Sequence, residues 1–159
     1  MSDNTYQFLC DEMLTGLGRW LRIAGFDTEL VTPGTPDKEV AQIAKSTNRI
    51  FLTCDSPLAK RLKNKPEVLL LSSSDVDSCV AELNQKLPIN WSANAFTRCS
   101  VCNHEIHLAT ENEINSLRID LSNNGPVYYC KYCDKLYWEG SHVKRMRNRL
   151  KKFQTLSAQ

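Results

Sequence analysis

Two short apolar runs in the first third of the chain each lead into an aspartate that precedes a helical pattern. Residues 8–10 lead into Asp11, and residues 50–53 lead, after one cysteine, into Asp55. Runs this short and apolar are typical of strands that are buried on both faces of a parallel sheet. Open α/β sheets place their ligands at the carboxyl ends of such strands. We therefore expect Asp11 and Asp55 to lie at one edge of a sheet.

Helical and strand patterns alternate through the first half of the chain. Apolar residues follow the first aspartate at helical spacing: Met13, Leu17, Trp20, Leu21 and Ala24. Gly25 predicts the end of that helix, and we interpret Arg19 and Arg22, which lie off the apolar stripe, as solvent-facing. Further strands are predicted at 26–31 and 68–71, with a helix after each. The alternation predicts an α/β fold, a parallel sheet flanked by helices.

A third acid, Asp37, lies in the first turn of a predicted helix between these strands, where Thr35 would be the cap and Pro36 would follow it. Carboxylates that are brought together repel one another and need a cation. Oxygen ligands without nearby His or Cys favour Mg²⁺ or Mn²⁺, and such a site suits in-line attack of water on a phosphodiester. Each acid also has a simpler interpretation, as a helix cap or as a charge that complements the helix dipole.

Length and composition predict an ordinary globular protein. The chain has 159 residues, of which 42% are hydrophobic, so it can form one domain or a small domain with an appendage. The amino terminus lacks the pattern of a signal peptide, and no apolar run approaches the ~20 residues that a membrane span needs. The glycine-rich motifs of nucleotide cofactors are absent. We expect a cytoplasmic protein without a membrane partner.

Four of the seven cysteines form two CxxC motifs that are separated by 27 residues: Cys99, Cys102, Cys130 and Cys133. Four thiolates in two such motifs predict a closed tetrahedral Zn²⁺ site with a structural role. A redox-active pair is the alternative interpretation of CxxC, and His104 and His107 are alternative ligands. Cys10, Cys54 and Cys79 are interpreted as small core residues.

A basic helix is predicted near the carboxyl end. Its apolar face would be formed by Val143, Met146, Leu150 and Phe153. Six of the nine residues 144–152 are Lys or Arg, and residues 96–159 carry ten basic against six acidic side chains, whereas residues 1–95 carry ten against twelve. Such a run is usually a solvated helix face. Next to aromatic residues and a zinc motif, it favours contact with the phosphates of a nucleic acid.

Ordered blocks of the sequence resemble the Mut-seven C-terminal RNase domain family. The blocks are residues 11–14, 17–22, 25–28 and 50–55, then Arg98-Cys99-x-x-Cys102-Asn103, Cys130-x-x-Cys133 and residues 137–142. Together they extend over nearly the whole chain, from about Phe8 to Met146. The resemblance implies a PIN-like α/β nuclease core at 1–92, followed by a four-cysteine zinc ribbon and a basic helix at 93–159.

The resemblance also implies roles for residues. Asp11, Asp37 and Asp55 would hold a catalytic Mg²⁺ or Mn²⁺, and the four cysteines would hold a structural Zn²⁺. The substrate would be RNA. Candidate RNA contacts are Arg98, His142, Lys144, Arg145, Arg147 and Arg149.

The sequence departs from the family pattern at two places, and one alternative function remains. The family usually has a basic residue where this chain has Cys54, and Asp75 and Asp77 match no position of a fourth ligand. The alternative to a metal-dependent ribonuclease is an inactive nucleic-acid-binding or adaptor protein that uses its zinc ribbon and basic helix. The three acids favour the enzyme, because a binding module gains nothing from acids that face a polyanion.

Overall fold

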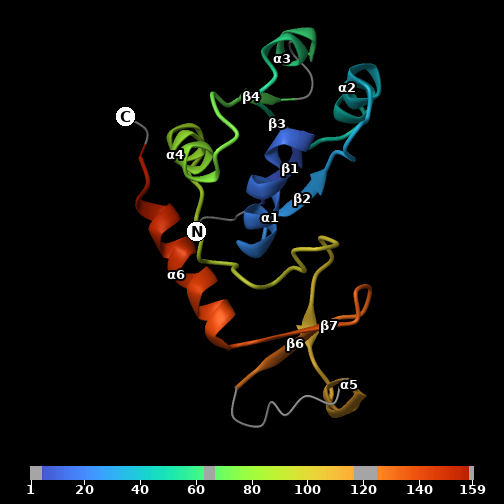
Figure 1. The fold of residues 1–159 in the computed structure, drawn as a ribbon, viewed down its shortest axis with the longest axis vertical. Helices are drawn as coiled ribbons and strands as arrows, with labels where there is room; N and C mark the ends of the chain where they lie inside the picture. Colours follow the sequence, from blue (N-terminus) through green and yellow to red (C-terminus); the bar gives the residue numbers. More distant parts are fainter. Residues whose placement is uncertain (1–4, 63–66, 117–124, 158–159) are drawn as a thin grey trace.

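A parallel four-stranded sheet forms the centre of the computed structural model, which describes residues 5–62, 67–116 and 125–157 (Figure 1). Its strands are β1 (Gln7–Cys10), β2 (Asp27–Leu30), β3 (Ile50–Thr53) and β4 (Val68–Leu70), in the order β2-β1-β3-β4. All three neighbouring pairs are parallel. The predicted α/β class, with a parallel sheet flanked by helices, is confirmed.

Helices cover both faces of this sheet. Side chains alternate along each strand, so neighbouring residues of one strand pack against different helices. The elements are η1 (Glu12–Leu14), α1 (Thr15–Ile23), α2 (Asp37–Lys45), α3 (Ser56–Leu62), α4 (Val76–Lys86) and α6 (Ser141–Thr155). Phe8 and Cys10 of β1 pack with residues of α1, α4 and α6. Leu9, which points to the opposite face, packs with α2 and α3. The result is a three-layer sandwich, with α2 and α3 on one side and α4 and α6 on the other (Figure 1).

Two details near the helix starts differ from the sequence predictions. Met13 lies in the short 3₁₀ turn η1 rather than on the buried stripe of α1, and it is 60% exposed. Thr35 does not cap α2, because its hydroxyl donates to the carbonyl of Thr32 and Pro36 occupies the cap position. Gly25 follows α1 with a φ of +98°, so the predicted glycine stop is confirmed.

A small antiparallel sheet carries the cysteine motifs. It consists of β5 (His107–Leu108), β6 (Val127–Cys130) and β7 (Lys135–Trp138), in that order, with α5 (Glu111–Ser116) between β5 and β6. The second CxxC motif begins at Cys130, the last residue of β6, and continues into the turn before β7, where Asp134 has a φ of +52°. Only Val127 and Leu136 form the buried part of its hydrophobic cluster among the described residues. A cluster of that size needs another source of stability.

Helix α6 returns the chain from this small sheet to the first core (Figure 1). Its Phe153 is fully buried, with its ring centroid 5.2 Å from that of Trp20 and 5.3 Å from that of Trp91. The Asn84 amide donates to the carbonyl of Phe153 at 2.8 Å. The division into two domains at 92/93 remains a prediction. Helix α6 lies after this boundary in sequence, but it completes a core that is built mostly by residues before it.

Arg22 attaches the first core to the first cysteine motif, and its predicted exposure to solvent is wrong. The side chain is only 5% exposed. Its Nε donates to the carbonyl of Thr28 at 2.8 Å, and its Nη1 donates to the carbonyls of Ser100 and Val101 at 3.2 and 3.1 Å. These oxygens replace the water that the guanidinium loses on burial.

Asn103 adds further hydrogen bonds between the first core and the segment that carries the first cysteine motif. It is buried and has a φ of +74°, which the residue after a tight cysteine turn tolerates when it is Asn or Gly. Its Oδ1 accepts from the backbone N–H of Thr28 at 2.9 Å, and its Nδ2 donates to Asp27 at 2.6 Å. Arg98 donates to the carbonyl of Asn103 at 2.8 Å. The first cysteine motif is therefore hydrogen-bonded to the edge strand β2.

We expect Asn103→Ala to lower the free energy of unfolding by about 2–3 kcal/mol. The alanine leaves the buried Thr28 N–H unpaired, and its side chain strains the backbone at a positive φ. Asn103→Gly should cost less, since glycine relieves the backbone strain while losing the same hydrogen bonds. The exposed Asn148 of α6 provides a control, and Asn148→Ala should change stability by less than about 0.5 kcal/mol. Urea unfolding measures all three. Parental stability of Asn103→Ala would contradict the role of this contact.

Candidate functional site

The sheet places Asp11 and Asp55 side by side. β1 and β3 are neighbours, with Cys10 opposite Leu52, and each aspartate follows the carboxyl end of its strand. The order β2-β1-β3 means that the chain leaves β1 toward one side of the sheet and β3 toward the other. Such a switch point, beyond the carboxyl ends of the two strands, is where open α/β sheets bind ligands.

Thr53 joins the two acids through one hydroxyl group. Its Oγ1 donates to Oδ2 of Asp11 at 2.8 Å and accepts from the backbone N–H of Asp55 at 3.0 Å. The other oxygen of Asp11 accepts from the N–H of Glu12 at 2.9 Å. Asp11 is 8% exposed and Thr53 is fully buried, so these bonds fix the orientation of the Asp11 carboxylate. We call Asp11, Thr53 and Asp55 the acidic edge.

Sequence reasoning missed Thr53, although a signal was present. It is the polar last residue of a strand that is otherwise apolar and buried along its whole length. In a parallel pair with Cys10 opposite Leu52, the next residues along the two strands are Asp11 and Thr53.

The acids also have the capping roles that the simpler interpretation gave them. Asp11 caps η1, and Oδ1 of Asp55 accepts from the N–H of Leu58 in the first turn of α3 at 3.1 Å. Asp37 is the exposed first residue of α2 and has no hydrogen-bond or ion-pair partner among the described residues. Capping and metal binding are compatible, because each carboxylate oxygen has two lone pairs.

The three acids do not form a compact cluster by themselves. In the described part of the chain, the four cysteines are the one group of at least three potential ligand side chains whose atoms lie within 4.8 Å of one another. Beside the acidic edge, burial and the negative charges of Asp11 and Asp55 raise the pKa of the Cys54 thiol. Cys54 therefore adds a neutral group beside the two acids.

The four cysteine sulfurs have the spacing that a tetrahedral metal site requires. Cys99 and Cys133 lie 3.8 Å apart at Sγ, and Cys102 and Cys130 lie 3.4 Å apart. A Zn²⁺ bound at ~2.3 Å to four tetrahedral sulfurs places neighbouring sulfurs about 3.8 Å apart. The donor set and its spacing fit Zn²⁺, and all four cysteines are free of disulfides.

The thiols differ in how readily they ionise. Burial disfavours the Cys99 thiolate, but hydrogen bonds from the Tyr137 hydroxyl and from backbone N–H groups outweigh it and lower the pKa of Cys99 to about 6. Burial and hydrogen bonds with Cys102 and Cys99 raise the pKa of Cys133 to about 12. Of the two, Cys99 gives up its proton more readily, and a bound cation would displace the thiol protons.

The six candidate RNA contacts fall into two groups. Arg98 is bound to the carbonyls of Gly25 and Asn103 and pairs with Glu105 at 3.5 Å. Arg147 makes two hydrogen bonds to Glu139, with a closest distance of 3.0 Å. Arg149 pairs with Asp77 at 3.1 Å. These three arginines are engaged within the chain, whereas His142, Lys144 and Arg145 are exposed and have no ion-pair partner among the described residues.

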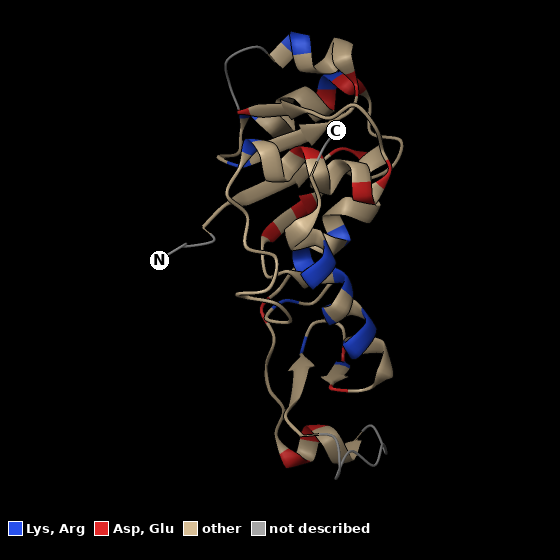
Figure 2. Cartoon of the chain, turned by 90° about the vertical axis from the view of Figure 1, so that its left-hand side faces the viewer, with Lys and Arg blue, Asp and Glu red and all other residues tan. Residues whose placement is uncertain are grey.

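The geometry of α6 explains this sorting. At about 100° per residue, one side of the helix carries the buried Val143, Leu150 and Phe153. The opposite side, which we call the outer face, carries Lys144, Arg145, Lys151 and Lys152. Arg147 and Arg149 flank the buried side, where their guanidinium groups also cover the aromatic rings of Phe96 and Trp20. Figure 2, in which α6 faces the viewer, shows basic residues along much of its length.

In the described residues, no helix has the length and hydropathy that a membrane crossing requires.

Comparisons with known proteins agree with the sequence blocks. The model of the Mut7-C RNAse domain family matches residues 6–150. A human protein named "Exonuclease mut-7 homolog" is 25% identical over 126 residues, which are 75% of this chain and 14% of that protein. The chain thus spans only a small part of that relative, and no solved structure matches it.

Because one family model covers almost the whole chain, including the acidic edge and all four clustered cysteines, the protein belongs to the Mut7-C RNAse domain family.

Proposed function

We propose that the protein is a divalent-metal-dependent ribonuclease that hydrolyses phosphodiester bonds at the acidic edge. The observation that carries the proposal is the position of Asp11 and Asp55 at the switch point of the sheet, where Thr53 joins them. The family and the name of the human relative support a nuclease. The RNA substrate and the catalytic metal are the parts that the proposal adds.

In this proposal Asp11, Asp37 and Asp55 hold Mg²⁺ or Mn²⁺, which prefer carboxylate oxygens. A cation bound there would neutralise charge on the scissile phosphate and activate water. The residues of the chain supply position: Thr53 and the N–H of Glu12 fix Asp11, and the cap to Leu58 fixes Asp55. Asp37, which is exposed and unpaired among the described residues, is free to turn toward a cation.

The second half of the chain holds the substrate and keeps its own shape through Zn²⁺. The four clustered cysteines bind the ion, and the outer face of α6 contacts RNA phosphates. None of the seven cysteines forms a disulfide, which suits the reducing cytoplasm.

The zinc proposal predicts one tightly bound Zn²⁺ per chain and its loss in Cys130→Ser. Since the small sheet has few buried apolar residues, we expect it to unfold without the ion. The hydrogen bonds from Arg22 to the first cysteine motif and from the Thr28 N–H to Asn103 should weaken as well, so the thermal midpoint of the whole chain should fall. Cys54→Ser, outside the group, should keep its zinc. Elemental analysis that finds well-folded parent protein without zinc would contradict the proposal.

The acidic edge predicts that Asp11→Asn lowers RNA cleavage by on the order of 100-fold or more, because the variant loses a charged ligand of the proposed catalytic cation. Each factor of ten in rate corresponds to ~1.4 kcal/mol of lost transition-state stabilisation. The asparagine keeps one acceptor oxygen for the cap, so stability should change by no more than about 1 kcal/mol. RNA binding should be equal or tighter, since one negative charge is removed.

Thr53→Val tests the hydrogen bonds that position these acids. Cleavage should fall by about tenfold, and the variant should need more Mg²⁺ or Mn²⁺ for half-maximal rate, because the Asp11 carboxylate loses its orientation. Asp77→Asn changes an acid outside the acidic edge and should cleave as the parent does. Cleavage assays on labelled RNA with added metal or EDTA measure these rates. An Asp11→Asn variant that cleaves at the parental rate would remove Asp11 from the mechanism, and a parent protein that binds RNA without cleaving it would support an adaptor instead of an enzyme.

The outer face of α6 predicts a different signature. Joint replacement of its four cations by Ala should weaken RNA binding and reduce the dependence of log Kd on log salt by up to about 3, at about 0.7 per phosphate contact on a single strand. Arg147→Ala with Arg149→Ala should mainly lower stability, since both side chains are held by acids and aromatic rings. Equal salt slopes for the outer-face variant and the parent would show that this face is only solvated.

A further inference from the structure

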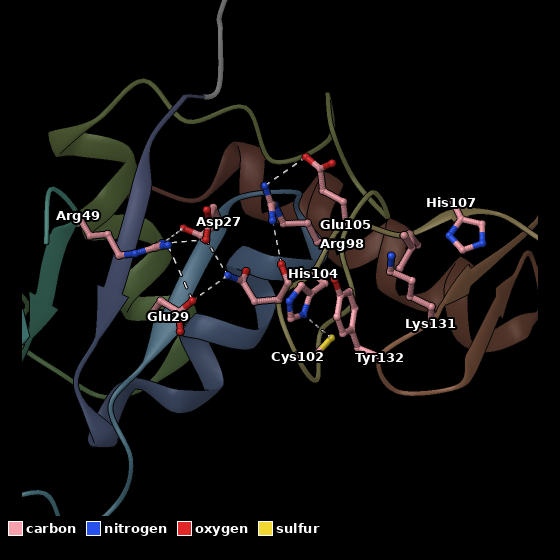
Figure 3. Close-up of a pocket in the computed structure, with 12 residues that line it drawn as sticks. Asp27, Glu29, Arg49, Arg98, Cys102, His104, Glu105, His107, Lys131 and Tyr132 are labelled. Carbon is pink, nitrogen blue, oxygen red and sulfur yellow. Dashed lines mark hydrogen bonds and ion pairs between the residues drawn. The ribbon is translucent and has the colours of Figure 1, made fainter.

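A cavity of about 580 Å³ opens where edge strand β2 meets the cysteine motifs (Figure 3). We call it the junction cavity. Asp27 and Glu29 of β2 line one side, and Tyr132, His104 and Lys131 line the other. Its volume is within the range of ligand-binding pockets. It lies beside the first residue of β2, whereas the acidic edge lies beyond the last residues of β1 and β3.

Two aromatic rings stack on each other in this cavity. The centroids of His104 and Tyr132 are 3.6 Å apart and their planes differ by 19°. The rings come from different cysteine motifs and are seen lying against each other in Figure 3. Tyr132 is 59% exposed and His104 is exposed as well. The stack therefore lies at the surface and not in a hydrophobic core, so a further planar group can reach it from solvent.

The charges around the stack are balanced, in contrast to the outer face of α6. Three cations and three carboxylates line the cavity, namely Arg49, Arg98, Lys131, Asp27, Glu29 and Glu105. Arg49 pairs with Asp27 at 2.8 Å, and Arg98 pairs with Glu105 at 3.5 Å. Only Lys131 has no ion-pair partner among the described residues, with its Nζ 5.3 Å from the centroid of Tyr132. This balance disfavours a phosphate and favours a neutral ring.

Two exposed carboxylates at the rim of the junction cavity indicate which kind of planar ring could bind there. The side chain of Glu105 is 79% exposed and that of Glu29 is 55% exposed, so both can reach a bound group. Carboxylates accept hydrogen bonds from exocyclic amino groups of bases. Adenine, cytosine and guanine carry such groups, and uracil does not.

We propose that the junction cavity binds one unpaired, amino-bearing nucleobase of the RNA substrate, stacked on the His104–Tyr132 pair. The inference rests on the proposed ribonuclease function and adds a recognition site to it. The four-residue strands of the sheet are ~13 Å long, so this base belongs to a nucleotide other than the one that is cleaved. Stacking on aromatic rings is the usual way in which proteins hold single-stranded bases.

The first test replaces the ring. In an Asp11→Asn background, which prevents cleavage, Tyr132→Ala should weaken binding of short fluorescein-labelled single-stranded adenosine homopolymer by about tenfold. Its salt slope should stay parental, because no phosphate contact is lost, and this separates stacking from the outer face of α6. Tyr132→Trp should bind as tightly as the background protein. Fluorescence anisotropy measures all of these affinities.

The zinc content of the Tyr132→Ala variant shows whether Tyr132 stacks on RNA or only supports the metal site. Tyr132 lies next to Cys133, and Nδ1 of His104 lies 3.4 Å from Sγ of Cys102. If Tyr132→Ala loses zinc, or keeps zinc and binds RNA as before, the proposal is overturned. Intact zinc with weakened binding supports it. With Asp11 restored, Tyr132→Ala should raise KM and leave kcat unchanged, since the ring lies far from the acidic edge.

The second test addresses the base edge. Glu105→Ala should lower the ratio of affinity for adenosine over uridine homopolymer, because only adenine offers an amino group to the carboxylate. An unchanged ratio overturns the assignment of an amino-bearing base. If the parent protein neither binds nor cleaves RNA, the proposed function itself fails. If it does both and Tyr132→Ala matches it, only the junction cavity proposal fails.

Discussion

The guanidinium of Arg22 lies buried between the α/β core and the first cysteine motif, with three carbonyl oxygens as its partners. A buried charge is costly unless such partners replace its water. Burial lowers the pKa of Arg22, and the negative charges of Glu29 and of the cysteines Cys102 and Cys99 oppose that change. A four-thiolate zinc centre would carry a net charge of −2 beside this cation. With Zn²⁺ bound, the core and the metal centre would therefore compensate each other electrostatically across their contact.

The parts of the fold that could be predicted from the sequence are those that depend on neighbours along the chain. The strand at 50–53, the glycine stop at Gly25 and the apolar stripe of α6 follow from local periodicity and backbone preference. The common edge of Asp11 and Asp55 follows from the general rules for parallel sheets, whereas the pairing of β1 with β3 is seen only in the structure. The four cysteines could be grouped because their spacing is itself a chemical pattern.

What could not be predicted depends on partners far away in sequence. Arg22 looked solvent-facing because its carbonyl partners at Ser100 and Val101 lie more than seventy residues later. The arginines of α6 could not be separated from its lysines, since Asp77 and Glu139 belong to other elements. The role of Thr53 needed the register of two strands. The roles of the catalytic acids and RNA contacts remain predictions.

Helix α6 completes the first core only after the chain has passed through the small sheet. Until Phe153 reaches them, Trp20 and Trp91 lack the ring that they pack against in the native structure. Contacts between such distant residues slow folding, because the loop that joins them must close first. A growing chain would thus expose two tryptophans to other partners until the intervening segment has formed. The supply of zinc, by setting the time at which that segment folds, would also set how long this aggregation-prone surface stays open.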